Sequence, residues 1–251
     1  MEAGLAGIDA CFHLAAVASV ARGVEDWLGT HRANLTGTIT LFDTIRRERA
    51  GIPVVYASSA AVYGDCQVVP ISETAPRRPQ SAYGADKYAC ELHALVASHV
   101  HHVPMVGLRF FNVYGPRQDP RSPYSGVISI FCERLRRGAP IEIFGDGHQA
   151  RDFIYVGDVV ASLRAAMALR PDDAPAFNVC TGVATSVLGF AQLIAMLSGV
   201  AATIRHAAPR AGEIRESVGT PALARGVLGL GPPLALRDGL RHVLDWLDAA
   251  A

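Results

Sequence analysis

Short apolar runs that alternate with longer amphipathic stretches are the feature that most restricts the fold of this chain. Four runs consist almost entirely of apolar residues. This pattern is typical of parallel strands that are covered by helices on both faces of a sheet. These predicted strands lie at residues 8–16, 53–59, 103–111 and 174–182. The predicted helices between them lie at 24–49, 82–99 and 157–170. The alternation predicts an α/β fold with a doubly wound, Rossmann-like parallel sheet.

Two other segments are richer in Pro and Gly and predict a smaller mixed α/β lobe over the carboxyl edge of the sheet, where open α/β folds bind ligands. We expect residues 1–112 to form the main domain, 152–182 to return to it, and 113–151 with 183–251 to form the lobe. Its predicted elements are helices at 126–137, 186–198 and 236–250, strands at 140–145 and 202–206, and a loop at 226–235.

Composition limits the possible partners and the compartment. Lys and Arg number 23 against 23 Asp and Glu, which argues against nucleic acid and against an anionic membrane as partners. The five cysteines are scattered and lack C-x-x-C spacing, so neither a disulfide framework nor a zinc site is expected. No apolar run reaches the length of a membrane helix, and no basic segment precedes the first apolar run. We therefore expect a cytoplasmic protein.

Tyr83 and Lys87 are four residues apart on a predicted helix, so their side chains share one face. An ammonium beside a phenol stabilises the phenolate and lowers the phenol pKa, which would make Tyr83 usable as a base. Ser59 ends the preceding strand, where its hydroxyl could bond the same substrate oxygen. This combination predicts proton-transfer chemistry.

Other conspicuous residues are interpreted as structural. The histidines His99, His101 and His102 are expected at the surface of a helix-to-strand junction, so no metal site is predicted. Arg215 is expected to be an exposed loop arginine. Trp27 and Trp246 lie on helical patterns and are expected to pack in the interior.

Seven motifs resemble, in this order, a known family. They are HLAAVASV, NLTGT, ASSAAVYG, YGADK, LRFFNVYGPRQDP, GDGHQARDFIYVGDVV and FNVCTG. The chain resembles the extended short-chain dehydrogenases/reductases, in their NAD-dependent nucleotide-sugar epimerase/dehydratase branch, and is most similar to members that epimerise UDP-glucose or UDP-N-acetylglucosamine at C4. The resemblance implies NAD as cofactor, a UDP-sugar as substrate, and transient oxidation at C4 followed by return of the hydride.

The resemblance also implies roles for single residues. Tyr83 would be the base and acid at the 4-hydroxyl, Lys87 would hold the nicotinamide ribose, and Ser59 would orient the sugar hydroxyl. Besides Tyr83 and Lys87, the implied cofactor-binding residues are Ala15, Ala16, Asn34, Ser58, Phe110 and Phe111.

On the substrate side the resemblance implies that Asn112, Arg151 and Arg210 reach the diphosphate, since arginine offers planar bidentate donors. Glu213 would bind the ribose hydroxyls, and Ser217 would leave room for an N-acetyl group without requiring one.

The turn after Ser59 separates epimerases from their relatives. Dehydratases of this family carry an Asp-Glu pair there, whereas this chain has Ala60 and Ala61, which cannot transfer protons. Elimination is therefore disfavoured. Two alternatives stay open: another nucleotide-sugar reductase or dehydratase of the family, and a truncated, non-catalytic homologue.

The family's glycine-rich G-x-x-G-x-x-G turn does not occur in this sequence. The nearest glycine cluster, at 226–231, is predicted to be a loop. Residues 8–16 resemble the family's fourth strand, so we expect a shortened family member with weak NAD binding and an apolar strand at the sheet edge. At full length, a homodimer through the helices at 24–49 and 82–99 is expected from the resemblance.

Overall fold

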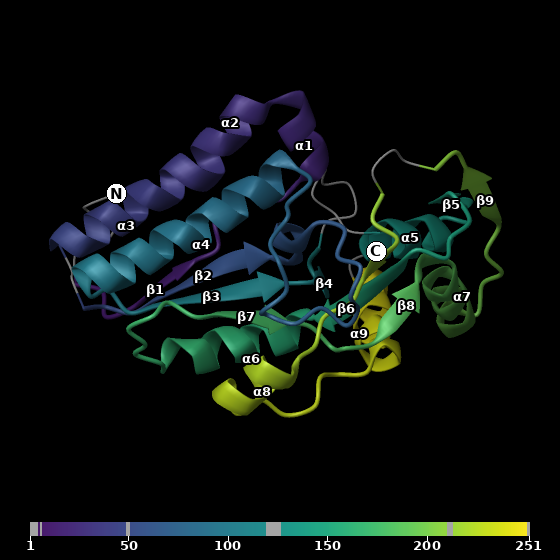
Figure 1. Cartoon of the computed structure of the whole chain (residues 1–251). Helices are drawn as coiled ribbons and strands as arrows, with labels where there is room; N and C mark the ends of the chain where they lie inside the picture. The colour runs from purple at the N-terminus through teal and green to yellow at the C-terminus, as the bar shows by residue number, and fades with distance from the viewer. Residues whose placement is uncertain (1–4, 6, 49–50, 119–126, 210–212, 250–251) are drawn as a thin grey trace.

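A central parallel sheet lies between two layers of helices (Figure 1). The computed structural model describes residues 5, 7–48, 51–118, 127–209 and 213–249. The sheet has the order β1-β2-β3-β7, with every pairing parallel. Its strands are β1 (Cys11–His13), β2 (Val54–Ser59), β3 (Met105–Phe110) and β7 (Ala176–Val179). Each strand lies within a predicted run, and the predicted α/β class is confirmed.

The two faces of the sheet bury alternate side chains of each strand, because successive residues point to opposite sides. Val54 packs in one cluster with α3 (Gly37–Glu48) and α4 (Ala82–His101). Val55 packs in another cluster with α6 (Val156–Met167), which covers the opposite face (Figure 1). The sheet is therefore doubly wound, as predicted.

The strand β1 lies at one edge of the sheet and, among the described residues, pairs only with β2. The side chains of Phe12 and Leu14 are 48% exposed beside this edge. The prediction of an apolar edge strand is confirmed.

The predicted helix at 24–49 is divided into shorter segments. They are α1 (Val20–Glu25), α2 (Trp27–His31), a π-helical turn (Arg32–Thr36) and α3. Asp26 separates the first two because its backbone leaves the helical region and its carboxylate caps α2. The prediction that Trp27 packs in the interior is wrong: it is 68% exposed on α2, whereas Trp246 packs against the lobe core.

The lobe contains a second sheet of order β10-β6-β4, with β8 antiparallel to β6, and a separate parallel pair β5-β9. The strands are β4 (Asn112–Tyr114), β5 (Ile141–Phe144), β6 (Ala150–Tyr155), β8 (Ala184–Ser186), β9 (Ile204–Ala207) and β10 (Glu216–Ser217). The helices α5 (Val127–Arg136), α7 (Val187–Ser198) and α9 (Leu236–Ala249) enclose the lobe core. The short strands β4, β6, β8 and β10 were not predicted, because they are too short or too charged to give an apolar pattern.

The chain returns to the main sheet after Tyr155, since β6 pairs within the lobe while α6 and β7 pack in the main sheet. The division into domains stays a prediction. The predicted start of the loop at 226–235 is wrong, because residues 226–228 belong to the helix α8 (Ala222–Leu228). Gly229 then ends α8 with a φ of 63°, in the left-handed conformation that glycine adopts readily.

Within the described ranges, no helix combines the length and apolarity needed to cross a bilayer. The same ranges bring no three His, Cys, Asp or Glu side chains together as a metal site would require.

Candidate active site

A cavity of about 810 Å³ opens at the carboxyl ends of β2 and β3, with the lobe as its other wall. Its lining comes from the ends of these strands, the segment after β1, the start of α4, one side of α6, and lobe residues on β4, β6, α5 and β10. Most of the predicted site residues line it: Ala16, Ser58, Ser59, Tyr83, Lys87, Phe110, Phe111, Asn112, Arg151, Glu213 and Ser217. The predicted Arg210 lies outside the described residues.

The first two turns of α4 carry Tyr83 and Lys87 to one side of the cavity. Ser81 caps this helix by accepting a hydrogen bond from the amide of Gly84 at 3.1 Å. Lys87 is 3% exposed, and its Nζ donates to the carbonyl oxygen of Ala57 at 2.9 Å. The same Nζ lies 5.9 Å from the centre of the Tyr83 ring. The predicted i, i+4 pair therefore forms one wall.

Ser59 ends β2 and caps the 3-10 turn Ala60–Tyr63, where its Oγ accepts a hydrogen bond from the amide of Ala61 at 3.2 Å. The Ser59 side chain also lies near enough to Tyr83 to lower the pKa of its phenol. Gly84 permits this approach, because a Cβ at residue 84 would lie 2.6 Å from the backbone oxygen of Ala61. The structure thus brings Ser59, Tyr83 and Lys87 together, although their roles stay predictions.

Burial raises the pKa of the Tyr83 phenol above its usual value. The hydrogen bond with Ser59 lowers that pKa, and the nearby Cys90 raises it further. Burial also lowers the pKa of Lys87. The predicted net lowering of the Tyr83 pKa is therefore not found in this structure, because desolvation of the phenolate outweighs the hydrogen bond with Ser59.

On the cofactor side, the exposed methyl group of Ala16 lines the cavity, while Ala15 is exposed beside the lining. Asn34 is fully buried and does not line the cavity. Its amide accepts a hydrogen bond from the backbone N–H of Val17 at 2.7 Å and donates to the carbonyl oxygen of the same residue at 3.1 Å. Asn34 therefore holds the loop after β1 in place.

Ser58 belongs to a buried polar network behind the cavity. Its Oγ donates to Glu91, and Glu91 receives two further hydrogen bonds from Arg109, at 2.8 Å from Nε and 2.7 Å from Nη2. The Nη1 atom of Arg109 donates to the hydroxyl of Tyr63 at 2.7 Å. This network joins α4 to β2 and β3, and the sequence analysis missed Glu91 and Arg109. An arginine inside an apolar strand was the available signal.

Two aromatic side chains at the carboxyl end of β3 line the cavity. Phe110 is partly buried, and Phe111 is 6% exposed, packed with Val62 and Ile71. The sequence analysis also missed Gln118 on the lining, whose Oε1 accepts a hydrogen bond from Ser129.

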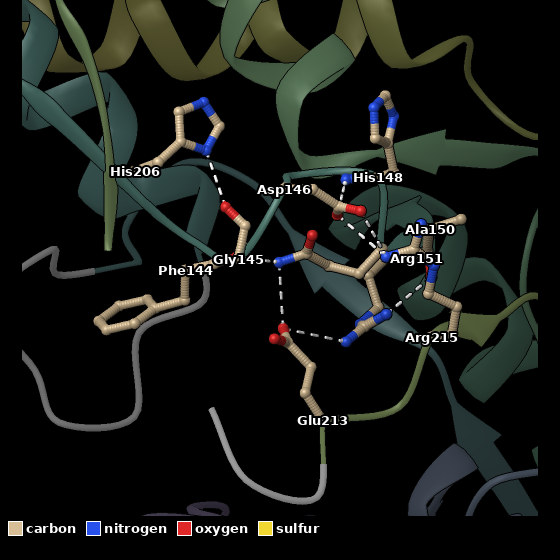
Figure 2. Close-up of polar contacts among 10 residues, drawn as sticks. Phe144, Gly145, Asp146, His148, Ala150, Arg151, His206, Glu213 and Arg215 are labelled. Carbon is tan, nitrogen blue, oxygen red and sulfur yellow. Dashed lines mark hydrogen bonds and ion pairs between the residues drawn. The ribbon is translucent and has the colours of Figure 1, made fainter. Parts of the chain in front are cut away.

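The lobe contributes Asn112 from β4, Arg151 from β6 and Ser217 from β10. Ser217 and Arg151 are paired neighbours in the parallel β10-β6 ladder. Figure 2 shows the Arg151 guanidinium beside the Glu213 carboxylate, with 3.7 Å between Nη2 and Oε1. Arg151 also donates from Nη1 to the carbonyl oxygen of Ala150 at 2.8 Å, and burial lowers its pKa.

The parallel sheet, together with a serine, a tyrosine and a lysine at its carboxyl edge, defines a Rossmann-like protein of the short-chain dehydrogenase/reductase class. A model of the NAD dependent epimerase/dehydratase family matches residues 2–180. This chain belongs to that family.

The chain is 36% identical over 241 residues to a UDP-glucose 4-epimerase of Mycolicibacterium smegmatis, covering 94% of this chain and 74% of that protein. The structure of this chain is similar to that of UDP-glucose 4-epimerase from Thermotoga maritima with UDP-glucose. The TM-score is 0.92 and the identity 33%, and the match covers 96% of this chain and 78% of that chain. This structure is also similar to that of UDP-glucuronic acid 4-epimerase from Bacillus cereus in complex with UDP-glucuronic acid and NAD, with a TM-score of 0.91, 27% identity, and coverage of 100% and 78%.

Proposed function

We propose that this chain is a NAD-dependent UDP-sugar 4-epimerase that interconverts UDP-glucose and UDP-galactose or the N-acetylated pair. The observation that carries the proposal is that Ser59, Tyr83 and Lys87 share one cavity with Arg151 and Glu213. Proton-transfer groups and a cation suited to a diphosphate therefore face the same volume. The volume of about 810 Å³ lies in the usual range of small-molecule sites.

The residues of the cavity fit the nicotinamide half of the cofactor. Ala16 and Ala18 offer small walls that let a flat ring approach the backbone. The Lys87 ammonium has three N–H donors, and within the described residues one of them donates to the carbonyl oxygen of Ala57. The other two can donate to ribose hydroxyls and to the phenol oxygen. NAD, when bound, supplies a hydride acceptor and donor for C4 of the sugar.

Tyr83 takes the proton from the 4-hydroxyl and returns it to the product in this proposal. Ser59 has one donor and two acceptor sites, and the amide of Ala61 occupies one acceptor site, which fixes the hydroxyl near Tyr83. The hydroxyl can therefore bond the sugar oxygen while the phenol exchanges its proton.

Two methyl groups support epimerisation over elimination. Ala60 and Ala61 line the cavity directly after Ser59. Removal of a 6-hydroxyl needs an acid and a base beside C6, and alanine offers neither.

The test is incubation of the chain with UDP-galactose and added NAD, followed by separation of the nucleotide sugars. We expect UDP-glucose to appear with no net NADH. A stable 4-keto-6-deoxy product would reject epimerisation in favour of a dehydratase. A chain that binds UDP but turns nothing over would support a non-catalytic homologue.

A Tyr83→Phe variant assigns the activity to this cavity. It removes only the phenol oxygen, so we expect turnover to fall by about 10²–10⁴-fold while UDP binding is retained. Undiminished turnover would remove Tyr83 from the proposal.

A further inference from the structure

Gln149 is a buried polar residue of the lobe to which the proposed function gives no role. It is 5% exposed and precedes β6, the strand that carries Arg151. Its Nε2 atom donates two hydrogen bonds, to the carbonyl oxygen of Phe144 at 2.9 Å and to Oε1 of Glu213 at 3.1 Å. Both N–H bonds of the amide group are therefore used.

These partners fix the orientation of the amide. Phe144 offers a carbonyl oxygen and Glu213 offers a carboxylate oxygen, and both can only accept. A flipped amide would direct its own oxygen at the two acceptors, which is repulsive. Gln149 is thus held as a donor aimed at Glu213.

Among the described residues, Gln149 makes a shorter contact with the Glu213 carboxylate than Arg151 does. Nη2 of Arg151 lies 3.7 Å from the same Oε1 atom, beyond ordinary hydrogen-bond distance (Figure 2). The Glu213 side chain is 25% exposed and lines the cavity. Gln149 therefore holds this carboxylate at the cavity wall, while the Arg151 guanidinium keeps donors for another anion.

A second interaction, nearer the protein surface, holds the segment that contains Glu213. Arg215 donates from Nη1 to both carboxylate oxygens of Asp146 at 3.0 Å (Figure 2). These side chains are 65% and 52% exposed, so water and salt screen their attraction. The part-buried hydrogen bond from Gln149 to the charged carboxylate is the stronger constraint on Glu213.

We propose that Gln149 is a positioning residue that aims the Glu213 carboxylate at the ribose of the nucleotide, and that the pair selects ribonucleotide over 2′-deoxyribonucleotide sugars. The inference rests on the proposed function. A carboxylate can accept hydrogen bonds from the two neighbouring hydroxyls of a ribose, and a 2′-deoxyribose lacks one of them. The selectivity depends on where the carboxylate is held.

The experiment measures the affinity of the full chain for UDP and for 2′-deoxy-UDP by titration calorimetry. We expect the native chain to bind UDP about tenfold more tightly than 2′-deoxy-UDP, the difference typical of one hydrogen bond to a charged group. Gln149→Met keeps the side-chain length but removes the donor, and we expect the preference to fall toward one. Affinity for 2′-deoxy-UDP should change less than twofold.

A double variant tests whether Gln149 acts through Glu213. Gln149→Met in a Glu213→Ala background should change neither affinity beyond the effect of Glu213→Ala alone. A matched control is Gln192→Ala, on the exposed side of α7, which should leave the preference unchanged. If Gln149→Met does not fold, Gln149→Asn keeps a buried amide that is one methylene shorter, and it carries the same expectation.

The outcomes separate the two proposals. UDP binding with an unchanged preference in the Gln149 variants would overturn the positioning role and leave the proposed function intact. No UDP binding by the native chain would overturn both.

Discussion

Tyr83 is partly buried beside Ser59 and Lys87, and burial governs the proton affinity of its phenol. A phenolate in this position loses hydration that a neutral phenol does not need, so the pKa rises. The hydrogen bond with Ser59 acts in the opposite direction. Because Tyr83 is the proposed base, this balance sets the pH at which the reaction becomes fast.

The pH profile of kcat/KM tests this balance through Ser59→Ala. The hydrogen bond stabilises the phenolate, so its removal raises the pKa of Tyr83 further. Activity that needs the phenolate increases with pH, and in Ser59→Ala that increase should begin at a higher pH than in the native chain. Ser72→Ala, in an exposed hydrogen bond with Thr74, is the control and should not move the profile. A shift of the profile to lower pH would contradict the assignment.

At the scale of elements, α4 must lie close against the turn that follows β2. Gly84 makes this contact possible, and Arg109 with Glu91 joins the same helix to β3 behind the cavity. The contact at Gly84 and the ion pair of Arg109 with Glu91 can be removed by separate substitutions.

Replacement of Gly84 by Ala should separate α4 from the turn. The added Cβ would lie 2.6 Å from the oxygen of Ala61, a backbone atom that cannot move aside alone. We expect a loss of about 1–3 kcal/mol in the free energy of unfolding and a larger relative loss of turnover. Denaturant unfolding and the epimerase assay measure the two effects.

The control is Gly226→Ala on α8, where an added Cβ meets nothing within 4 Å. Alanine favours a helix by about 0.5–1 kcal/mol over glycine, so this variant should be as stable as the native chain or more so. Equal stability of the Gly84 and Gly226 variants would show that α4 does not need the close contact.

Removal of one partner from the buried ion pair should be costly. Arg109→Met leaves the Glu91 carboxylate, 8% exposed, without its cation, and we expect a loss of about 3–5 kcal/mol. Arg241→Ala removes a comparable pair with Asp238 at the surface, where both side chains are about half exposed, and should cost less than about 1 kcal/mol. Chemical denaturation measures the free energy of unfolding of both variants. Similar losses would contradict the expectation that the buried ion pair contributes more to stability than the exposed one.

At the scale of the whole molecule, one side of α4 presents an apolar row to solvent. Leu92, Val96 and Val100 are 48%, 51% and 61% exposed and repeat every four residues. Such a row on one helix face fits a helix of a second copy.

We therefore predict a homodimer through α4, measurable by light scattering. Val96→Glu should shift the chain to a monomer, because two carboxylates would be buried at a symmetric contact. Met196→Glu, at a 59% exposed site on α7, should leave the dimer intact. A native monomer, or a dimer unaffected by Val96→Glu, would contradict the prediction.

The sequence predicted the main sheet well and the lobe less well. Residues 54–59 and 105–110 gave a clear signal because their strands are buried on both faces. The strand at 150–155 was missed because Arg151 and Asp152 interrupt its apolar pattern. Asp152 is fully buried only because Thr181 and Gly182, far along the chain, donate to its carboxylate.

The order of residues alone determined the alternating fold and the spacing that places Tyr83 and Lys87 on one helix face, since both follow from local periodicity. Only the tertiary structure decided that burial raises the pKa of Tyr83, that the Asn34 amide is hydrogen-bonded to the backbone of Val17, and that Gln149 donates a hydrogen bond to Glu213. Desolvation and hydrogen bonding between distant segments depend on which side chains enclose a group in three dimensions, and no local pattern records that enclosure.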